Sequence, residues 1–574
     1  MKEPIIEFVN FTFKYRAQVE PTLHNIDLRI YEGEKILIVG PSGSGKSTLS
    51  NCINGLIPHI YTGEIQGEVR VRGKNITEAS LFDLSCIVGT VLQDTDGQFI
   101  GLTVAEDIAF ALENDCVAQD DMFKKVDEIA GIVEVDKLLT SRPGELSGGQ
   151  KQRVSMAGVM VRDVDILLFD EPLANLDPAT GKRAIALIDD IQKKTGKTIV
   201  IIEHRLEDAL YRDADRVILV NDGRIAADMT PDELMSTDTL IRAGIREPLY
   251  VTALKSAGIT IRPEDEAGQI DTLHTSDYAG TVRKWYQKQP TRTKDASGEE
   301  VLSVRNLTFA YEEGKTVLED VSFAVRRGEM LAIVGKNGAG KTTLSNLICG
   351  FVKPVSGEIR LNGEDISPLS VKERGERIGL VMQNPNQMIS KSMIYDEVAL
   401  GLQVRGVPED EIKERVNAVL KICGLYPYRN WPISALSFGQ KKRVTIAAIL
   451  VMEPDIMILD EPTAGQDYRH YTEIMEFIKG INEKSGTTII MITHDMHLML
   501  EYTDRSVVIA DGHLLADSSP ASILTNDDIT DRAYLKRTSL YDLAHACGID
   551  DADGFTEAFI NYERSHRKEA ADGT

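Results

Sequence analysis

The strongest constraint on the fold of this 574-residue chain is a long internal duplication. A glycine-rich segment around Lys46 recurs around Lys341, at an offset of 341 − 46 = 295. Four later landmarks keep an offset of 290: Gln93 and Gln383, Ser147 and Ser437, Asp170 and Asp460, His204 and His494. A repeat of this length predicts two similar domains, because one hydrophobic core seldom grows to such a size.

The duplicated unit includes its own C-terminal extension. The segment 246–250 (REPLY) resembles 537–541 (RTSLY), and 256–259 (SAGI) resembles 546–549 (ACGI). Between the copies lies a unique polar stretch, in which the pair Trp285-Tyr286 suggests that part of it docks. We therefore predict a first domain at 1–262, a polar linker at 263–298 and a second domain at 299–574.

Charge and composition restrict the classes of function. The net charge of 64 − 89 = −25 repels a phosphate backbone and disfavours general nucleic-acid binding. No run of about 18 apolar residues occurs, and the N-terminus lacks a basic region followed by an apolar one, so we expect neither a membrane span nor export. The six cysteines form no C-x-x-C pair, which fits a reducing cytosol.

Short apolar runs alternate with helical patterns in each copy. In the first copy they cover 35–39, 165–169 and 198–202. Runs that are apolar almost throughout are typical of parallel strands buried on both faces of an α/β sheet. The loops at the C-terminal ends of such strands are where chemistry is expected.

Both copies contain the phosphate-binding pattern G-x-x-x-x-G-K-[ST] directly after an apolar strand. Glycines let successive backbone N–H groups turn onto phosphate oxygens, the following helix presents its positive N-terminus, and the lysine adds a cation. Ser47 and Thr342 would each place a hydroxyl on Mg²⁺. The two predicted loops are Gly40-Pro41-Ser42-Gly43-Ser44-Gly45-Lys46-Ser47-Thr48 and Gly335-Lys336-Asn337-Gly338-Ala339-Gly340-Lys341-Thr342-Thr343.

A pair of carboxylates closes a second apolar strand in each copy. These pairs are Asp170-Glu171 and Asp460-Glu461. Adjacent residues at a strand end can direct one carboxylate to a metal ion and the other to the water that attacks a γ-phosphate. We therefore predict Asp170 and Asp460 as metal ligands, and Glu171 and Glu461 as catalytic residues.

Two further segments resemble the signature of the ATP-binding-cassette (ABC) ATPases. They are Leu146-Ser147-Gly148-Gly149-Gln150 and the variant Leu436-Ser437-Phe438-Gly439-Gln440. After each of them, apolar residues at i, i+3, i+4 and i+7 indicate a helix with one buried face. The resemblance implies an α/β P-loop NTPase fold with two tandem ABC ATPase domains, each carrying a helical signature subdomain.

In that family two cassettes pair head to tail, and each ATP lies between one copy's phosphate loop and the other's signature. Carried over to this chain, this arrangement gives two sites. One site would combine the first loop with Gln93, Asp170, Glu171 and His204, and it would face Ser437, Phe438, Gly439 and Gln440. The second loop with Gln383, Asp460, Glu461 and His494 would face Ser147, Gly148, Gly149 and Gln150. The resemblance also implies Gln93 and Gln383 as catalytic residues and metal ligands, with ATP and Mg²⁺ as cofactors.

Other positions have competing interpretations. In the family, a histidine at the place of His204 and His494 contacts the γ-phosphate, whereas a single histidine after a strand is more often structural. Because the histidine recurs at the repeat offset, we predict His204 and His494 as catalytic residues that contact this phosphate. We predict that the rings of Tyr15 and Tyr311 stack on adenine, with packing in the core as the alternative. Asp177 and Asp467 fit the loop that crosses the cassette interface, although Gln466 replaces the usual leucine there.

The segments 93–99 and 383–388 resemble the glutamine loop of the energy-coupling-factor importers, which bring vitamins or transition-metal ions into prokaryotic cells. Phe99, Ile100, Met388 and Ile389 are then candidates for contact with a transmembrane partner, or ordinary packing residues of the helical subdomain. We predict the ATP-hydrolysing subunit of such an importer, on the cytoplasmic face of the cell membrane. Its partners would be an energy-coupling transmembrane protein and a substrate-capturing membrane protein, with no nucleic acid. The alternatives are a sugar importer's double cassette and, less favoured, a soluble ABC ATPase acting on ribosomes or nucleic acid.

Overall fold

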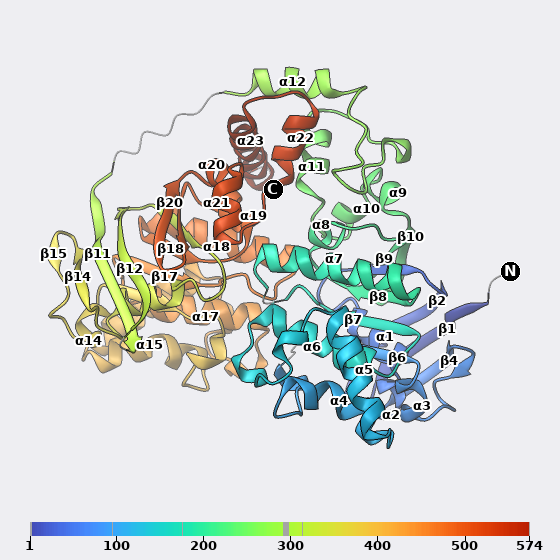
Figure 1. The fold of residues 1–574 in the computed structure, drawn as a ribbon. Coiled ribbons are helices and arrows are strands. Elements are labelled where there is room, and N and C mark those ends of the chain that lie inside the picture. The colour runs from blue at the N-terminus through green and yellow to red at the C-terminus, as the bar shows by residue number, and fades with distance from the viewer. Residues whose placement is uncertain (1–2, 94–95, 175, 291–297, 313, 573–574) are drawn as a thin grey trace. The chain divides into compact units, whose positions relative to one another are not determined.

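The computed structural model describes residues 3–93, 96–174, 176–290, 298–312 and 314–572, which form two compact units (Figure 1). The first comprises residues 1–282 and 467–469, and the second 283–466 and 470–574. The two units repeat the same order of strands. The domain boundaries proposed from the sequence stay a prediction, although helix α12 (Ala279–Lys288) shows that the linker has regular structure.

In the first unit, a six-stranded sheet places the strands predicted from apolar runs side by side. Its order is β10-β9-β3-β8-β7-β6, and all neighbours are parallel except β9 and β10. Every residue of β3 and β8 is buried, which confirms the predicted α/β class. The bounds are β3 (Lys35–Val39), β6 (Val88–Val91), β7 (Ile166–Asp170), β8 (Thr198–Ile202), β9 (Arg216–Asn221) and β10 (Arg224–Met229).

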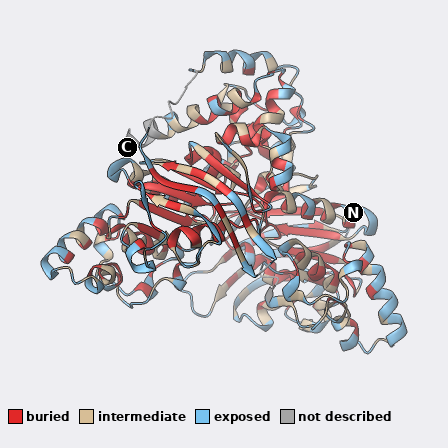
Figure 2. Cartoon of the chain, turned by 60° about the vertical axis from the view of Figure 1, so that its left-hand side comes forward, coloured by how far each residue is buried: buried red, intermediate tan, exposed pale blue. Residues whose placement is uncertain are grey.

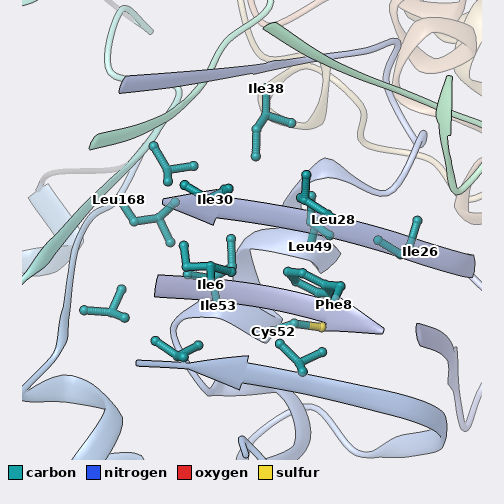
Figure 3. Packing of buried hydrophobic residues seen from close by; sticks show 14 of the residues in the cluster. Ile6, Phe8, Ile26, Leu28, Ile30, Ile38, Leu49, Cys52, Ile53 and Leu168 are labelled. Atoms are coloured by element: carbon teal, nitrogen blue, oxygen red, sulfur yellow. The ribbon is translucent and has the colours of Figure 1, made fainter. Parts of the chain in front are cut away.

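A four-stranded antiparallel sheet covers this layer, and the core lies between the two sheets. Side chains of both sheets meet those of α1 (Lys46–Ile53) in one cluster, which includes Phe8, Leu28, Leu49 and Leu168 (Figure 3). Burial of this apolar surface stabilises the helix that follows the phosphate loop. The antiparallel strands are β2 (Leu23–Tyr31), β1 (Pro4–Tyr15), β4 (Gly63–Val71) and β5 (Lys74–Asn75).

Helices complete the first unit. α4, α5 and α6 pack against one another as a helical subdomain, while α7 follows Asp177 and α9 to α11 form the extension. The helices are α2 (Leu56–His59), α3 (Leu81–Ser85), α4 (Val104–Asn114), α5 (Gln119–Ile132), α6 (Gly148–Met160), α7 (Pro178–Thr195), α8 (Leu206–Ala209), α9 (Pro231–Met235), α10 (Thr239–Arg242) and α11 (Leu249–Ser256).

The second unit has the same layers. Its main sheet has the order β16-β17-β18-β13-β19-β20, and its antiparallel sheet has the order β12-β11-β14-β15. The strands are β11 (Glu300–Glu312), β12 (Lys315–Arg326), β13 (Met330–Val334), β14 (Ser356–Leu361), β15 (Glu364–Asp365), β16 (Ile378–Val381), β17 (Ile456–Asp460), β18 (Thr488–Ile492), β19 (Arg505–Ala510) and β20 (His513–Ser518).

Most helices of the second unit correspond to those of the first, but in the described residues α2 has no counterpart between α13 and β14, and the long helix α23 follows α22. They are α13 (Lys341–Cys349), α14 (Val371–Arg374), α15 (Ile394–Val404), α16 (Glu409–Ile422), α17 (Phe438–Leu450), α18 (Tyr468–Ser485), α19 (Met496–Tyr502), α20 (Pro520–Leu524), α21 (Asp527–Ala533), α22 (Ser539–Ala546) and α23 (Ala552–Asp572). Buried strands surrounded by helices with exposed outer faces are visible in Figure 2. Across the ranges described, none of the helices combines the length and the apolar character that crossing a membrane requires.

Candidate nucleotide sites

The phosphate loop of the first unit joins β3 to α1, as the sequence predicts. Gly45 caps α1 in the left-handed region at φ 105°, where a Cβ would approach Leu23 Cδ2 to 2.8 Å. A Cβ at Gly40 would collide with the carbonyl oxygen of Val220. Glycine is therefore required at both positions, because a side chain would displace neighbouring residues.

The loop lysines are buried and fold back on their own loops. Nζ of Lys46 donates to the carbonyls of Gly40 (2.8 Å) and Pro41 (3.0 Å). In the second unit, Nζ of Lys341 makes the same bonds to Gly335 (2.8 Å) and Lys336 (2.9 Å). Burial lowers the pKa of Lys46, opposed by the charges of Glu171 and other nearby carboxylates.

Hydroxyl groups at the start of these helices differ in exposure. Ser47 and Thr342 are exposed, whereas Thr48 and Thr343 are buried. The hydroxyl of Tyr15 lies 3.1 Å from Thr48 Oγ1, and that of Tyr311 lies 3.3 Å from Thr343 Oγ1. Tyr311 is 60% exposed, so core packing does not account for it, while Tyr15 is half-buried beside Phe13. Adenine stacking by these rings stays a prediction.

The predicted carboxylate pairs lie at the C-terminal ends of β7 and β17. Asp170 and Asp460 end these strands, and Glu171 and Glu461 follow with φ of 50° and 44°. A left-handed backbone conformation is unfavourable for a residue with a Cβ, and residues with such strain are often found at functional sites. The glutamate N–H groups donate to the carbonyls of Ile202 and Ile492, each at 2.9 Å, so the neighbouring strand holds each turn.

Each glutamate contacts the predicted histidine of its own unit. Nε2 of His204 lies 2.7 Å from Oε1 of Glu171, and Nδ1 of His494 lies 2.7 Å from Oε1 of Glu461. Burial acts to raise the pKa of Glu171, but the hydrogen bond and charge of His204, together with Lys46, lower it overall. An ionised carboxylate beside a histidine can orient a water molecule or accept a proton from it.

The pKa of Asp170 shifts in the opposite direction to that of Glu171. Burial, followed by the charge of Glu171, raises the pKa of Asp170 to about 6. Burial and the charge of Glu461 likewise raise the pKa of Asp460. A bound cation would offset this cost, and hydroxyl, amide and carboxylate oxygens are the donors that Mg²⁺ prefers. The residues present in each unit therefore fit that ion: Ser47, Gln93 and Asp170, and Thr342, Gln383 and Asp460.

The two glutamines are placed differently. Nε2 of Gln93 donates to Oε2 of Glu171 at 2.6 Å. Within the ranges described, no hydrogen bond joins the amide of Gln383 to Glu461, whose Oε2 instead accepts one from Thr493 Oγ1 at 3.3 Å. Asp94 and Thr95 of the predicted glutamine loop lie outside the described residues.

The signature serines begin the helices that the apolar spacing predicts. Ser147 caps α6 and Ser437 caps α17, each in a reciprocal pair with the glutamine three residues later. The pairs are Ser147 N–H to Gln150 Oε1 (2.8 Å) and Ser437 N–H to Gln440 Oε1 (3.0 Å). Within its own unit each turn belongs to the helical subdomain. That it completes the twin's nucleotide site stays a prediction.

The two aspartates predicted for the interface loop are both buried. Asp177 caps α7 by accepting a bond from Thr180 N–H at 2.9 Å. Residues 467–469 group with the first unit, where Asp467 Oδ2 accepts a bond from Ser42 N–H at 2.6 Å. Leu176 before the first aspartate is buried, whereas Gln466 before the second is half-buried, as its polar side chain permits.

Some features of these sites were not found from the sequence. Lys442 is 1% exposed beside the carboxylates of the second unit, and burial lowers its pKa to about 8 against the charges of Asp460 and Glu461. Glu203 is buried before His204 and accepts bonds from the N–H groups of Leu173, His204 and Arg205. The sequence did contain one indication, because the two copies differ at these positions. At the offset of 290, Gln152 corresponds to Lys442 and Thr493 corresponds to Glu203.

A duplicated P-loop α/β fold, with carboxylates, histidine and glutamine at one end of each sheet, defines a tandem-cassette nucleotide hydrolase. The family model of ABC transporters matches residues 23–174 and 318–464, and a model described as an ATP-binding cassette cobalt transporter matches 237–309. This chain belongs to the ABC transporter ATP-binding proteins and is an ATPase with two fused cassettes that resembles those of the energy-coupling-factor importers.

Full-length relatives agree with this assignment. A protein of Enterococcus faecalis is 59% identical over 99% of this chain and 100% of its own length. One of Clostridium perfringens is 56% identical over 99% of this chain and 100% of its own length. Both are named "Putative ABC transporter ATP-binding protein". A solved structure of cbiO1 from Clostridium perfringens, described as part of the ABC transporter complex cbiONQ, is 36% identical, with a TM-score of 0.38 over 41% of this chain and 94% of its own.

Proposed function

We propose that this chain is the energy-coupling subunit of a membrane importer for a vitamin or a transition-metal ion. The observation that carries the proposal is the match of residues 237–309 to the cobalt-transporter family model. That segment covers α10, α11 and α12, so it extends beyond the cassette core common to ABC ATPases. Both copies also keep the complete set of glutamate, histidine and glutamine, which does not favour a sugar importer with one degenerate site.

ATP-driven closure is the proposed source of work. The two cassettes would pair head to tail, so that each ATP contacts a phosphate loop and the signature turn of the other copy. Because ATP then makes more contacts in the closed state, it shifts the equilibrium towards closure, and hydrolysis reopens the pair. Mg²⁺ would be held by Ser47, Gln93 and Asp170, and by Thr342, Gln383 and Asp460, and it would neutralise charge on the phosphates.

The proposed partners are an energy-coupling transmembrane protein and a substrate-capturing membrane protein, which the chain would bind at the cytoplasmic face. The segment after each glutamine would contact the first of these. Ile100 is 64% exposed, which leaves its side chain open to a partner. Phe99, Met388 and Ile389 are half-buried, and Met388 Sδ accepts a bond from Met382 N–H, so these three also support the local fold.

Copurification and uptake test the proposal together. Tagged chain extracted in mild detergent should bring down a polytopic membrane protein, and cells expressing both should accumulate Co²⁺, Ni²⁺ or one of a panel of water-soluble vitamins. The matched control is Lys46→Ala/Lys341→Ala, which should keep the partner and lose accumulation. Cosedimentation with ribosomes and no membrane partner would instead support the soluble alternative, and ATP-dependent sugar uptake would support the sugar importer.

A further inference from the structure

Lys442 is a buried charged residue on the helix that begins at the signature turn of the second unit. Its side chain is among the largest fully buried ones of the described chain, although an isolated buried ammonium is strongly unfavourable. Nζ donates to the carbonyls of Met382 (2.8 Å) and Gln383 (2.9 Å). These residues directly follow β16 and begin the glutamine loop, so one cation bonds α17 to that loop.

The first unit uses the corresponding position differently. Gln152, at 442 − 290 = 152, is also buried, but its Nε2 donates to the carbonyl of Pro172. Pro172 follows Glu171, so this amide bonds α6 to the turn after β7 and not to the glutamine loop. Gln93 is instead held through its own side chain, by the bond to Glu171.

The two units therefore fix their glutamine loops by different means. In the second unit, two backbone carbonyls are held by a charged donor, and such bonds are about twice as strong as neutral ones. The carboxylates of Asp460 and Glu461 add attraction that keeps the ammonium in place. Removal of Lys442 would leave the carbonyls of Met382 and Gln383 without this donor and release the backbone that carries Gln383.

We propose that Lys442 is a positioning residue for the second nucleotide site, which acts by holding the backbone of Gln383 against the signature helix. Lys442 bonds to loop carbonyls and not to the phosphate loop, so its effect reaches the reaction through Gln383. Loss of the lysine should thus lower kcat at that site and leave KM for ATP nearly unchanged. The inference rests on the ATPase activity of this family and on the role predicted for Gln383, and it is independent of the importer proposal.

Kinetics in a single-site background test the inference. Glu171→Gln silences the first site, and Lys442→Gln is then added, because glutamine is the residue that the twin position tolerates. We expect kcat to fall about tenfold with KM for ATP within twofold of the background. An unchanged kcat, or a loss confined to KM, would overturn the proposal. Gln152→Met in the same background is the matched control, and its expected effect on kcat is less than threefold.

Hydrogen exchange separates positioning from general destabilisation. In Lys442→Met, which keeps the side-chain volume but removes the donors, peptides covering 382–391 should exchange at least fivefold faster than in the parent, while peptides covering 330–350 remain unchanged. Gln152→Met should leave both regions at parental rates. Uniformly faster exchange throughout the second unit, or no change at 382–391, would refute the positioning role. If Lys442→Met does not fold, Lys442→Gln serves for the same comparison.

Discussion

Nε2 of His204 lies 2.7 Å from Oε1 of Glu171, while Oε2 of the same carboxylate accepts a bond from Gln93 at 2.6 Å. Residues separated by up to 111 positions, since 204 − 93 = 111, thus meet at one carboxylate group. In the second unit, Glu461 has the histidine contact but bonds to Thr493 in place of the glutamine. The two sites therefore share the glutamate, the histidine and the glutamine but have different hydrogen-bond networks.

Both glutamates should support turnover. We expect Glu171→Gln and Glu461→Gln each to lower the steady-state ATPase rate, and the double variant to lose at least 100-fold, because a positioned general base contributes about 10²–10⁴-fold. The rate is measured as phosphate released by purified chain at saturating ATP. An unchanged rate in either single variant would contradict two working sites.

The raised pKa of Asp170 predicts a pH-dependent stability without Mg²⁺. Its folded pKa of about 6 exceeds the unfolded value near 3.9, so the folded state is favoured at low pH and loses this contribution as the pH rises towards 6. Asp170→Asn, which mimics the neutral carboxyl, should therefore be more stable than the parent by about 1–3 kcal/mol at pH 7.5 in a chelator. Urea unfolding at pH 4 and pH 7.5 measures the difference.

Two controls accompany this measurement. The stabilities of parent and variant should converge near pH 4, where both carry a neutral group. Added Mg²⁺ should stabilise the parent at pH 7.5 and leave Asp170→Asn little changed. A variant less stable than the parent at pH 7.5 without Mg²⁺ would show that burial does not penalise the ionised carboxylate.

A buried ion pair distinguishes the two units. Nζ of Lys35 lies 2.7 Å from Oδ1 of Asp189, with both side chains less than 5% exposed, and Lys193 pairs with the same carboxylate. We expect Asp189→Leu to lower the free energy of unfolding by about 3–5 kcal/mol, because it leaves the Lys35 ammonium buried without a counter-charge. Lys35→Met should cost less, since Asp189 keeps Lys193.

The double variant Lys35→Met/Asp189→Leu is the informative control. It should regain most of the stability, because an apolar pair of similar volume avoids the desolvation cost. The second unit already has Met330 at the position of Lys35, by 330 − 35 = 295. Urea titration of the four variants gives the coupling energy, and additive losses would argue against a coupled pair.

The sequence alone predicts those parts of the site whose residues lie close together along the chain. The phosphate loops, the strands that end at Asp170 and Asp460, and the helices after Ser147 and Ser437 follow from glycine spacing and apolar periodicity. The contacts of Lys442 and the ring nitrogen that faces each glutamate do not, because they depend on how distant segments pack. The left-handed φ of Glu171 and Glu461 is likewise set by the neighbouring strand and leaves no local pattern.

The linker helix α12 packs through its aromatic side chains against α23. The ring of Trp285 on α12 lies 6.2 Å from Phe555 and 5.3 Å from Tyr562 of α23, between ring centroids. Tyr286 adds a 2.7 Å hydrogen bond to Asp551, and Arg283 donates to the carbonyl of Cys547 at 2.8 Å. Each aromatic pair contributes about 0.5–1.5 kcal/mol in addition to the stabilisation from the apolar area that it buries. Trp285 should therefore anchor α12 on α23.

We therefore expect Trp285→Ala to release this part of α12 from α23 and to expose its backbone to protease. Trypsin should cut the variant after Lys284 and Lys288 at least fivefold faster than the parent at equal protein concentration, with the products identified by mass spectrometry. Trp285→Phe keeps an aromatic ring and should be cut at close to the parental rate. Tyr286→Phe removes only the bond to Asp551, which is worth about 0.5–1.5 kcal/mol, and should have an intermediate effect. Equal cleavage of Trp285→Ala and the parent would mean that the ring contacts do not hold the linker, since cleavage follows the population of the locally opened state.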